Sequence, residues 1–473
     1  MDTLISEAGS DTQEAGLIPP READERGRLP LSLKLILLSW FLPEGLSFFV
    51  AGLRLNVIRL IFLVLTPVVF ARFAQKVSTG RYRFVASDVF VPAAAVWMLL
   101  GPSVLYSVSD ALEHSGPIVL EYLIAYMATR VLVEENGQAS AFVSLLCAVI
   151  AGICLDAALD TLTGRYFTKD LVSLISGVQG YRINENSFRY GLLRAAGPIE
   201  HPILFGFVAG IGLLFAVWTR IRLRRFCIAA CGLGIVICFS SAPEQSSLMG
   251  FGLLIYGRLM AGLKAKWLLC LGGIAAGALP LFLWSNSPFG FLINITTIDP
   301  ATAYYRLYIW NMVGPSILET PYFGVYSDNM DYQGSVDSLW LVLSMVYGMP
   351  CAILVGLSLI GCCSLPTSAP RAYLTKAESR VGTALGVVMA LVIFMGFTVH
   401  LWGSVWILVG LLTGLRAHLG ELGWLNRRLA TVLAVPRPIM LMLIVGGSFV
   451  AGSDNPHDGT LMPLGAVHPI CRT

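Results

Sequence analysis

Two arginine-containing segments carry the side chains best suited to chemistry. One is "RAAGPIEHPILFG" at 194–206, and the other is "YYRLYIWNM" at 304–312. A guanidinium group is planar, permanently charged and shaped to bind phosphate oxygens in pairs. Arg194, Arg306 and the nearby Arg189 are therefore candidates for holding a phosphorylated ligand. The plainer interpretation is that these arginines meet lipid headgroups at a membrane surface.

A histidine and an aspartate are the candidates for moving a proton. His201 follows a Gly-Pro break, and Asp337 precedes an apolar run that begins at Ser338. Each has a structural alternative, because His201 could stand at an ordinary helix start and either Asp337 or Ser338 could cap a helix. The functional interpretation makes Asp337 a general base at the membrane surface, with His201 as its competitor for that role.

Aromatic residues gather around Arg306, and Tyr305, Trp310 and Tyr326 are the candidates for contacting a sugar. Aromatic side chains near a bilayer usually form an interfacial belt, but they also offer apolar platforms with polar tips that suit sugar rings. Arg306 and Trp310 are four residues apart, so a helix would place both on one face. No D-x-D pair accompanies them, and we expect neither a metal nor a cofactor.

The composition indicates what must position these residues. Hydrophobic residues make up 56% of the chain and charged residues only 13%, against roughly 25% charged in a soluble domain. Apolar runs of about 15 to 22 residues recur along the chain, long enough or nearly so to cross a bilayer as helices. The sequence therefore predicts an all-α polytopic membrane protein. The net charge of +3 does not indicate a nucleic-acid partner, and most of the ten cysteines fall in apolar runs, as buried packing residues do.

About twelve transmembrane helices are expected from these runs. The predicted spans are 33–50, 55–71, 86–106, 116–133, 140–158, 199–218, 226–241, 246–262, 267–284, 338–361, 381–398 and 401–416. A further run at 438–451 is short, and the sequence leaves open whether it spans the membrane or lies at its surface.

Lysine and arginine set the expected orientation. They cluster after the second, sixth, eighth, tenth and twelfth predicted spans, so the positive-inside rule places those connections and the N-terminus in the cytoplasm. The resulting layout is a cytoplasmic tail at 1–32, a membrane domain at 33–416 and a C-terminal tail at 417–473. Two long periplasmic loops, at about 159–198 and 285–337, hold or adjoin every candidate residue, and loops of this length tend to be functional.

Several motifs resemble those of one family. The run "RLYIWNMVGPSILETPYFGVY" at 306–326 looks like the R-x-x-I/M-W…I…P-x-x-G signature of the O-antigen ligase and O-antigen/exopolysaccharide polymerase family. The segment at 194–206 resembles the arginine–glycine–"HP" start of the helix after that family's first outer loop. "PEGLSFFVAGLRLNVIRLIFLV" at 43–64 resembles its first hairpin, and "VDSLWLVLSMVYGMP" at 336–350 is similar to an ending seen in exopolysaccharide polymerases. The resemblance spans about 35–415.

This resemblance implies an all-helical, GT-C-like, metal-independent glycosyltransferase of the bacterial inner membrane. Its substrate would be a polyprenyl-pyrophosphate-linked oligosaccharide presented on the periplasmic face, with Arg194 and Arg306 holding the donor pyrophosphate. Membrane lipid would surround it, and flippase and chain-length regulator proteins would be its candidate protein partners.

A ligase and a transporter are the competing interpretations. Ligases of this family typically carry a histidine near the outer mouth of the helix after the large loop, where this chain has Asp337. That departure favours a polymerase over an O-antigen ligase acting on a lipid A core. A transporter of polysaccharide or lipid-linked glycan would show ionisable residues and broken helices at mid-membrane. The sequence offers few such residues, chiefly Glu44 and Asp156, both expected close to an interface.

Overall fold

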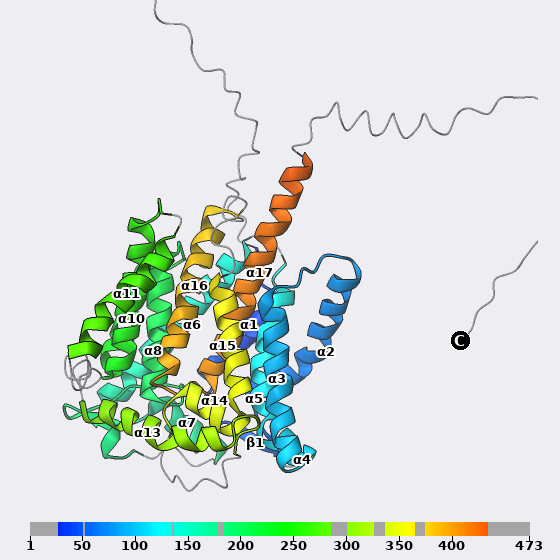
Figure 1. The fold of residues 1–473 in the computed structure, drawn as a ribbon. Helices are drawn as coiled ribbons and strands as arrows, with labels where there is room; N and C mark the ends of the chain where they lie inside the picture. The colour runs from blue at the N-terminus through cyan, green and yellow to red at the C-terminus, as the bar shows by residue number, and fades with distance from the viewer. Residues whose placement is uncertain are drawn as a thin grey trace, which may run out of the picture. The chain divides into compact units, whose positions relative to one another are not determined.

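The computed structural model of the 473-residue chain describes residues 27–50, 53–134, 137–177, 183–263, 265–284, 300–325, 336–364 and 374–433. Met1–Trp424 forms one compact unit and Leu425–Thr473 a second. The described chain is built almost entirely of helices (Figure 1). Most of the predicted N-terminal tail, the run at 438–451, parts of both long loops and Tyr326 lie outside the described residues.

Five of the described helices are long and apolar enough to cross a bilayer, and four shorter ones are also apolar. The five are α2 (Val57–Ser78), α3 (Ala86–Leu105), α6 (Gln138–Thr163), α16 (Lys376–Gly396) and the Ser404–Gly423 part of α17 (Ser404–Leu433). The prediction of an all-α, multi-pass membrane protein is confirmed at this level. Each predicted span overlaps a helix, whereas the count of about twelve crossings stays a prediction.

The N-terminal span differs from the prediction of one helix at 33–50. The helix α1 (Leu31–Leu38) continues only as the 3-10 turn η1 (Ser39–Phe41), and β1 (Ser47–Val50) then pairs antiparallel with β2 (Leu53–Asn56). Pro43 follows η1, and a proline in a helix interior lacks the N–H that the helix needs. The side chain of Asn56 then starts α2 by accepting a hydrogen bond from the Arg59 amide at 2.9 Å.

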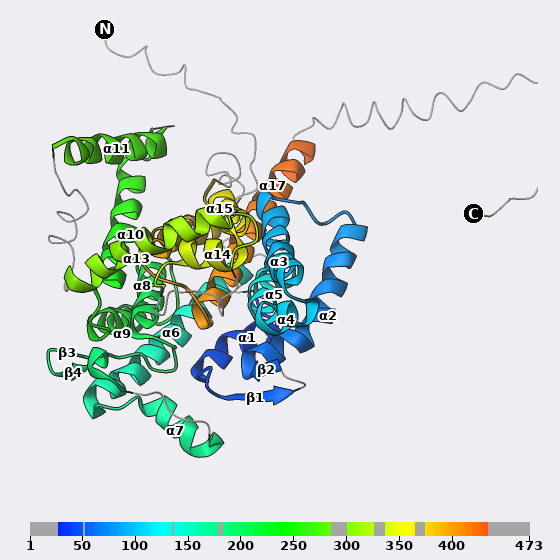
Figure 2. The same cartoon turned by 60° about the horizontal axis from the view of Figure 1, so that its bottom comes forward.

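The middle of the unit contains the other helices that lead to the long loops. In chain order they are α4 (Val108–His114), α5 (Gly116–Leu132), α7 (Phe167–Ser176), the 3-10 turn η2 (Glu185–Ser187), the short paired strands β3 (Phe188–Arg189) and β4 (Leu192–Leu193), α8 (Pro202–Trp218), α9 (Arg224–Ile237), α10 (Ser241–Leu259) and α11 (Lys266–Trp284). In Figure 1, α4, α7, α13 (Pro300–Glu319) and β1 lie at one end of this unit, and Figure 2 turns that end toward the viewer. We call it the hairpin end.

The predicted span at 338–361 is broken into two helices. They are α14 (Leu339–Tyr347) and α15 (Met349–Ser364), separated by Gly348 at φ +85°. A Cβ at Gly348 would collide with the carbonyl of Tyr322, and the backbone there adopts a conformation that favours glycine. The break lets the Tyr322–Val325 segment, which follows α13, pack against the end of α14, where Val325 N donates to Met345 O at 2.6 Å.

Close approach of small residues packs α17 against α5. A Cβ at Gly410 would lie 2.9 Å from the Cβ of Ala125, and one at Gly414 would collide with the carbonyl of Tyr126. Thr129 of α5 donates a hydrogen bond to the Leu411 carbonyl at 2.7 Å. Within a bilayer, helices associate through such close packing rather than through hydrophobic burial, so the glycine pair four residues apart is a packing motif.

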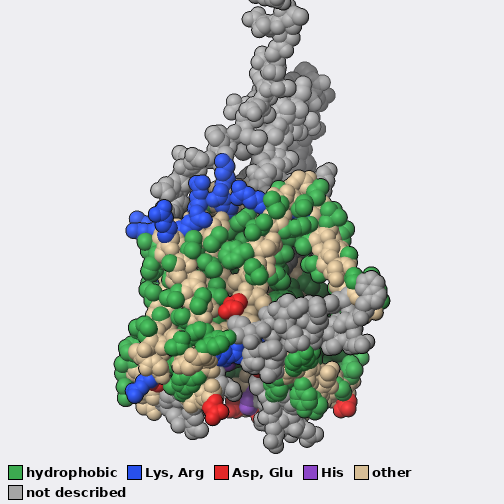
Figure 3. All heavy atoms as spheres, turned by 90° about the vertical axis from the view of Figure 1, so that its left-hand side faces the viewer, with side chains coloured by type: hydrophobic (Ala, Val, Ile, Leu, Met, Phe, Trp, Pro, Cys, Tyr) green, Lys and Arg blue, Asp and Glu red, His purple; other side chains and the backbone are tan. Residues whose placement is uncertain are grey.

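The end opposite the hairpin end contains a buried ion cluster. Arg130 of α5 pairs with Asp88 of α3, with 3.0 Å between Nε and Oδ1, and also with Glu421 of α17. The Tyr82 ring lies 4.2 Å from the Arg130 guanidinium. A buried charge of this kind is tolerable only when it is paired. Figure 3 shows Lys and Arg side chains gathered along one end of the surface, in keeping with the one-sided distribution predicted for the loops.

Candidate functional site

The segment between α7 and α8 fixes two of the predicted arginines on the end of α9. The amide of Arg194 donates to Ser187 O at 2.9 Å, and its Nε donates to Cys238 O at 3.2 Å. Arg189 donates from Nη1 to Phe239 O at 3.1 Å. Carbonyl groups at a helix C-terminus attract positive charge, so both guanidinium groups are held where α9 ends.

The third arginine, Arg306, comes from α13, so the stretch around it is helical. Ile309, Val313 and Ile317 on one side of α13 pack against Leu341 and Met345 of α14. This packing orients the helix without any contribution from the arginine.

Arg306 is half-buried beside this cluster, and its Nε makes no hydrogen bond with any described residue. Burial lowers the pKa of Arg306, the nearby Asp337 carboxylate opposes this, and Arg189 adds to it. The two long loops therefore converge, because Arg189 and Arg306 come from different loops and yet influence each other. A half-buried guanidinium with an unfilled donor is suited to an anion.

His201 lies within this positive field. Burial lowers its pKa to about 4, and three nearby positive charges act in the same direction. They belong to Arg194, Lys169 and Arg306. The ring is therefore neutral at physiological pH, and its Nδ1 accepts a hydrogen bond from the Ile203 amide at 3.2 Å as the cap of α8. An imidazole whose Nδ1 accepts carries its proton on Nε2, so this geometry suits a donor more than a base.

Asp337 does not cap the helix that follows it. Ser338 does, because its Oγ accepts from the Leu341 amide at 3.4 Å and donates to Gly396 O at 3.0 Å. The capping role that could have explained Asp337 therefore belongs to Ser338. Asp337 is half-buried, and its charge acts on Arg306. Its predicted role as general base stays a prediction.

The predicted aromatic residues separate into a packed one and an exposed one. Trp310 donates a hydrogen bond from its indole nitrogen to Phe397 O at 3.1 Å and stacks on the Phe397 ring. These contacts hold α13 against the end of α16. Tyr305 is 41% exposed and stacks on Tyr308, which is 51% exposed. The exposed pair offers the platform expected for a sugar, and glycan binding stays a prediction for all three predicted residues.

Sequence reasoning missed Lys169 of α7 as part of the site. Burial lowers the pKa of Lys169 to about 8, and the carboxylates of Glu200, Asp160 and Asp156 oppose this in that order. Asp160 also shapes the turn before α8, because its Oδ2 accepts from the Gly197 amide at 2.7 Å and the Ala196 amide at 3.1 Å. The sequence signal that could have indicated a site here is the pair Asp156 and Asp160, four residues apart in an otherwise apolar helix.

A second histidine was also missed. His400 stacks on Trp402 with ring centroids 5.3 Å apart, and the His201 ring lies 6.1 Å from the same tryptophan. Burial lowers the pKa of His400 to about 4. The segment also adjoins the start of α14, because Leu339 N donates to Val399 O at 3.2 Å. A histidine thus stands near this helix mouth after all, brought there from the α16–α17 connection.

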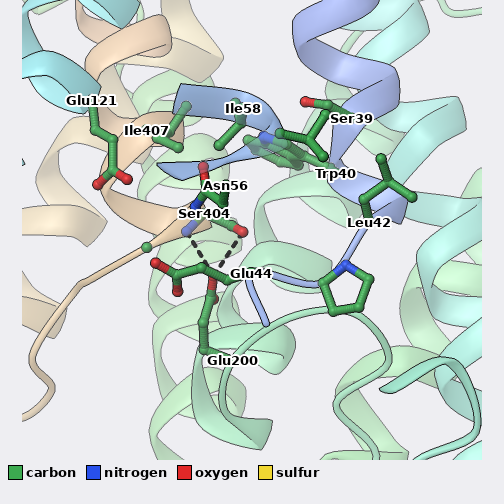
Figure 4. Close-up of a pocket in the computed structure, with 13 residues that line it drawn as sticks. Ser39, Trp40, Leu42, Glu44, Asn56, Ile58, Glu121, Glu200, Ser404 and Ile407 are labelled. Carbon is green, nitrogen blue, oxygen red and sulfur yellow. Dashed lines mark hydrogen bonds between the residues drawn. The ribbon is translucent and has the colours of Figure 1, made fainter. Parts of the chain in front are cut away.

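An acidic pocket adjoins the arginines, and Figure 4 shows its lining. It contains the carboxylates of Glu44, Glu121 and Glu200, which come from distant parts of the chain. Glu200 immediately precedes His201, so the acidic pocket and the positive cluster are adjacent. Among the described residues, no group of three His, Cys, Asp or Glu side chains is arranged to hold a metal ion.

No protein-family model matches this chain, and no curated protein matches it at a significant level. The chemistry of the site therefore follows from the arrangement of its own residues.

Proposed function

We propose that this chain is a glycosyltransferase that polymerises polyprenyl-pyrophosphate-linked repeat units of an exopolysaccharide or O-antigen. The observation that supports this is the convergence of Arg189, Arg194 and Arg306 from two loops, in a protein otherwise poor in charge. Arg306 has an unfilled donor among the described residues, and His201 presents a neutral ring in the same field. Such a cluster suits an anionic leaving group attached to a lipid.

The proposal includes a finer topology. The chain would cross the bacterial inner membrane about twelve times with its N-terminus in the cytoplasm. The hairpin end would then face the periplasm, where the lipid-linked repeat units are presented. The arrangement of helices supports this, because α7 and α13, which belong to the two long loops, lie at one end of the unit (Figure 1).

The proposed reaction breaks the anomeric C–O bond to the pyrophosphate while the hydroxyl of another repeat unit forms a new bond to the same carbon. The bonding electrons leave with the pyrophosphate, and the guanidinium groups stabilise its growing charge. Attack opposite to the leaving group inverts the anomeric carbon. In this proposal the positive charge comes from arginine rather than from a divalent cation. Asp337 and Glu200 are the candidates for taking the hydroxyl proton.

A deletion strain tests this function. We expect lipid-linked single repeat units to accumulate or to be displayed on the periplasmic side, and long polymer to be lost. Long polymer that forms but never reaches lipid A would indicate a ligase instead. Repeat units trapped on the cytoplasmic side would indicate a transporter, and either outcome would overturn the proposal.

A further inference from the structure

The acidic pocket at the hairpin end lies where four distant parts of the chain meet (Figure 4). Glu44 lies in the turn after η1, Glu121 in α5 and Glu200 just before α8. Gly403 and Ser404, at the start of α17, close the pocket from another side. The three carboxylates share this space with few basic groups.

One arginine forms ion pairs with two of the three acids. Arg59 of α2 lies 2.7 Å from Glu121, between Nε and Oε1, and 3.5 Å from Glu44, between Nη2 and Oε1. The third acid, Glu200, contacts the start of α17. Its Oε1 accepts from the amide and the hydroxyl of Ser404 at 3.0 and 2.9 Å, the two dashed lines in Figure 4. Its Oε2 is enclosed and accepts no hydrogen bond from any described residue. That oxygen is a buried acceptor without a donor.

Glycine at position 403 lets two of the carboxylates approach each other. Its φ is +56°, and a Cβ built there would collide with Glu200 Oε1 and lie 2.9 Å from Glu44 Oε2. Both carboxylates thus lie in the space that a side chain at position 403 would occupy. Two like charges this close, away from bulk water, disfavour each other, so the pair holds a proton more readily than either acid alone.

The groups around Glu200 connect the pocket with the arginine cluster. They are Glu44 from the turn after η1, Arg59 from α2, Glu121 from α5, Lys169 from α7 and His201 at the start of α8. The Lys169 ammonium interacts electrostatically with both Glu200 and His201. Glu200 therefore lines the pocket, while His201, the next residue, belongs to the arginine cluster.

We propose that Glu200 accepts the proton of the attacking hydroxyl, an inference that rests on the proposed glycosyl transfer. The hydroxyl oxygen bonds to the anomeric carbon, the C–O bond to pyrophosphate breaks with its electron pair, and the proton moves to Glu200 Oε2. The enclosed oxygen supplies the vacant acceptor that this step needs. His201 already accepts a hydrogen bond at Nδ1 as the cap of α8, so it does not take this proton. Glu200 and Asp337 remain as candidates for the general base.

The acidity of Glu200 agrees with this role. Burial raises the pKa of the Glu200 carboxyl to about 7, the Glu44 carboxylate acts in the same direction, and the hydrogen bonds from Ser404 oppose both. A general base works best when its pKa lies near the working pH. Because the base must be ionised, the rate should fall as the pH drops below about 7.

The test is the pH dependence of polymerisation by the full-length protein in liposomes supplied with a defined polyprenyl-pyrophosphate-linked repeat unit. Glu200→Gln keeps an oxygen for Ser404 but cannot take a proton, so we expect a loss of about 100-fold. Glu44→Gln removes the neighbouring like charge, so the acid limb of the profile should move to lower pH. The exposed Glu113→Gln on α4 is the matched control and should behave as wild type.

The outcomes separate this inference from the proposed function. Wild-type protein without any polymerisation would refute the function. An active wild type, an active Glu200→Gln and an inactive Asp337→Asn would keep the function and move the proton acceptor to Asp337. An unmoved acid limb in Glu44→Gln would also overturn the inference, because a purely structural role for Glu44 would leave the pH profile in place.

Discussion

Replacing Arg306 by lysine separates the charge of the guanidinium from its shape. Lysine keeps the positive charge but presents one compact ammonium instead of a planar fork, so it cannot bind two phosphate oxygens side by side. The substitution should leave α13 in place, because Ile309, Val313, Ile317 and the Trp310 hydrogen bond to Phe397 hold that helix. Any loss would then belong to the ligand rather than to the fold.

The magnitude follows from the hydrogen bond that is lost. A hydrogen bond to a charged group contributes about 1.5–3 kcal/mol. At 1.36 kcal/mol for each factor of ten, losing one arm of the fork should slow polymerisation by about 10-fold to 150-fold. Arg306→Ala removes the charge as well and should be at least as severe.

The assay compares initial rates of polymer formation in liposomes at a donor concentration well below saturation, alongside the amount of inserted protein. Arg165→Lys is the matched control, because Arg165 is exposed in the other long loop and should tolerate the change. A fully active Arg306→Ala that inserts normally would refute the pyrophosphate role. Equal losses in Arg306→Lys and Arg165→Lys would show that the loss is not specific to the proposed site.

Two further pairs of substitutions test other parts of the structure. Asp337→Asn should leave the cap of α14 in place and slow the reaction less than about tenfold, because it weakens the attraction toward Arg306, whereas Ser338→Ala should cost about 1 kcal/mol of stability as a lost cap. Thermal unfolding in detergent and the polymerisation rate measure the two effects, and a 100-fold rate loss in Asp337→Asn would contradict this assignment. Gly414→Leu should destabilise the α5–α17 contact by about 1–3 kcal/mol or prevent insertion, and Gly232→Leu, with no atom within 4 Å of a Cβ, should not. Equal thermal midpoints for the two glycine variants would refute the close-packing argument.

Much of the helical framework could be predicted from the apolar runs alone, because a bilayer demands long helical stretches of apolar residues. A helix around Arg306 was considered only as a condition for placing Arg306 and Trp310 on one face, and the structure forms it as α13. The break at Gly348 was not, because it depends on the Tyr322 backbone, which approaches from a distant part of the chain. The run at 33–50 is mostly apolar, and Pro43 and Gly45 were the signals that it could not remain one helix.

The candidate site was only half predictable. Arginine and histidine in outer loops are conspicuous in an apolar sequence, and the structure brings Arg194, Arg306 and His201 near one another. The partnership of Glu44 with Glu200 was not visible, because residues so far apart in the sequence meet only through the turn at Gly403. Hydropathy reports which segments cross the membrane, but it does not report which of their ends are neighbours.

The central claim is most directly tested by reconstituting the purified wild-type protein in liposomes with one defined polyprenyl-pyrophosphate-linked repeat unit. We expect a ladder of longer glycans, with one free polyprenyl pyrophosphate released for each bond formed, and no ladder from Arg194→Ala. Unchanged repeat units from a correctly inserted wild type would contradict it, as would an undiminished ladder from the Arg194 variant.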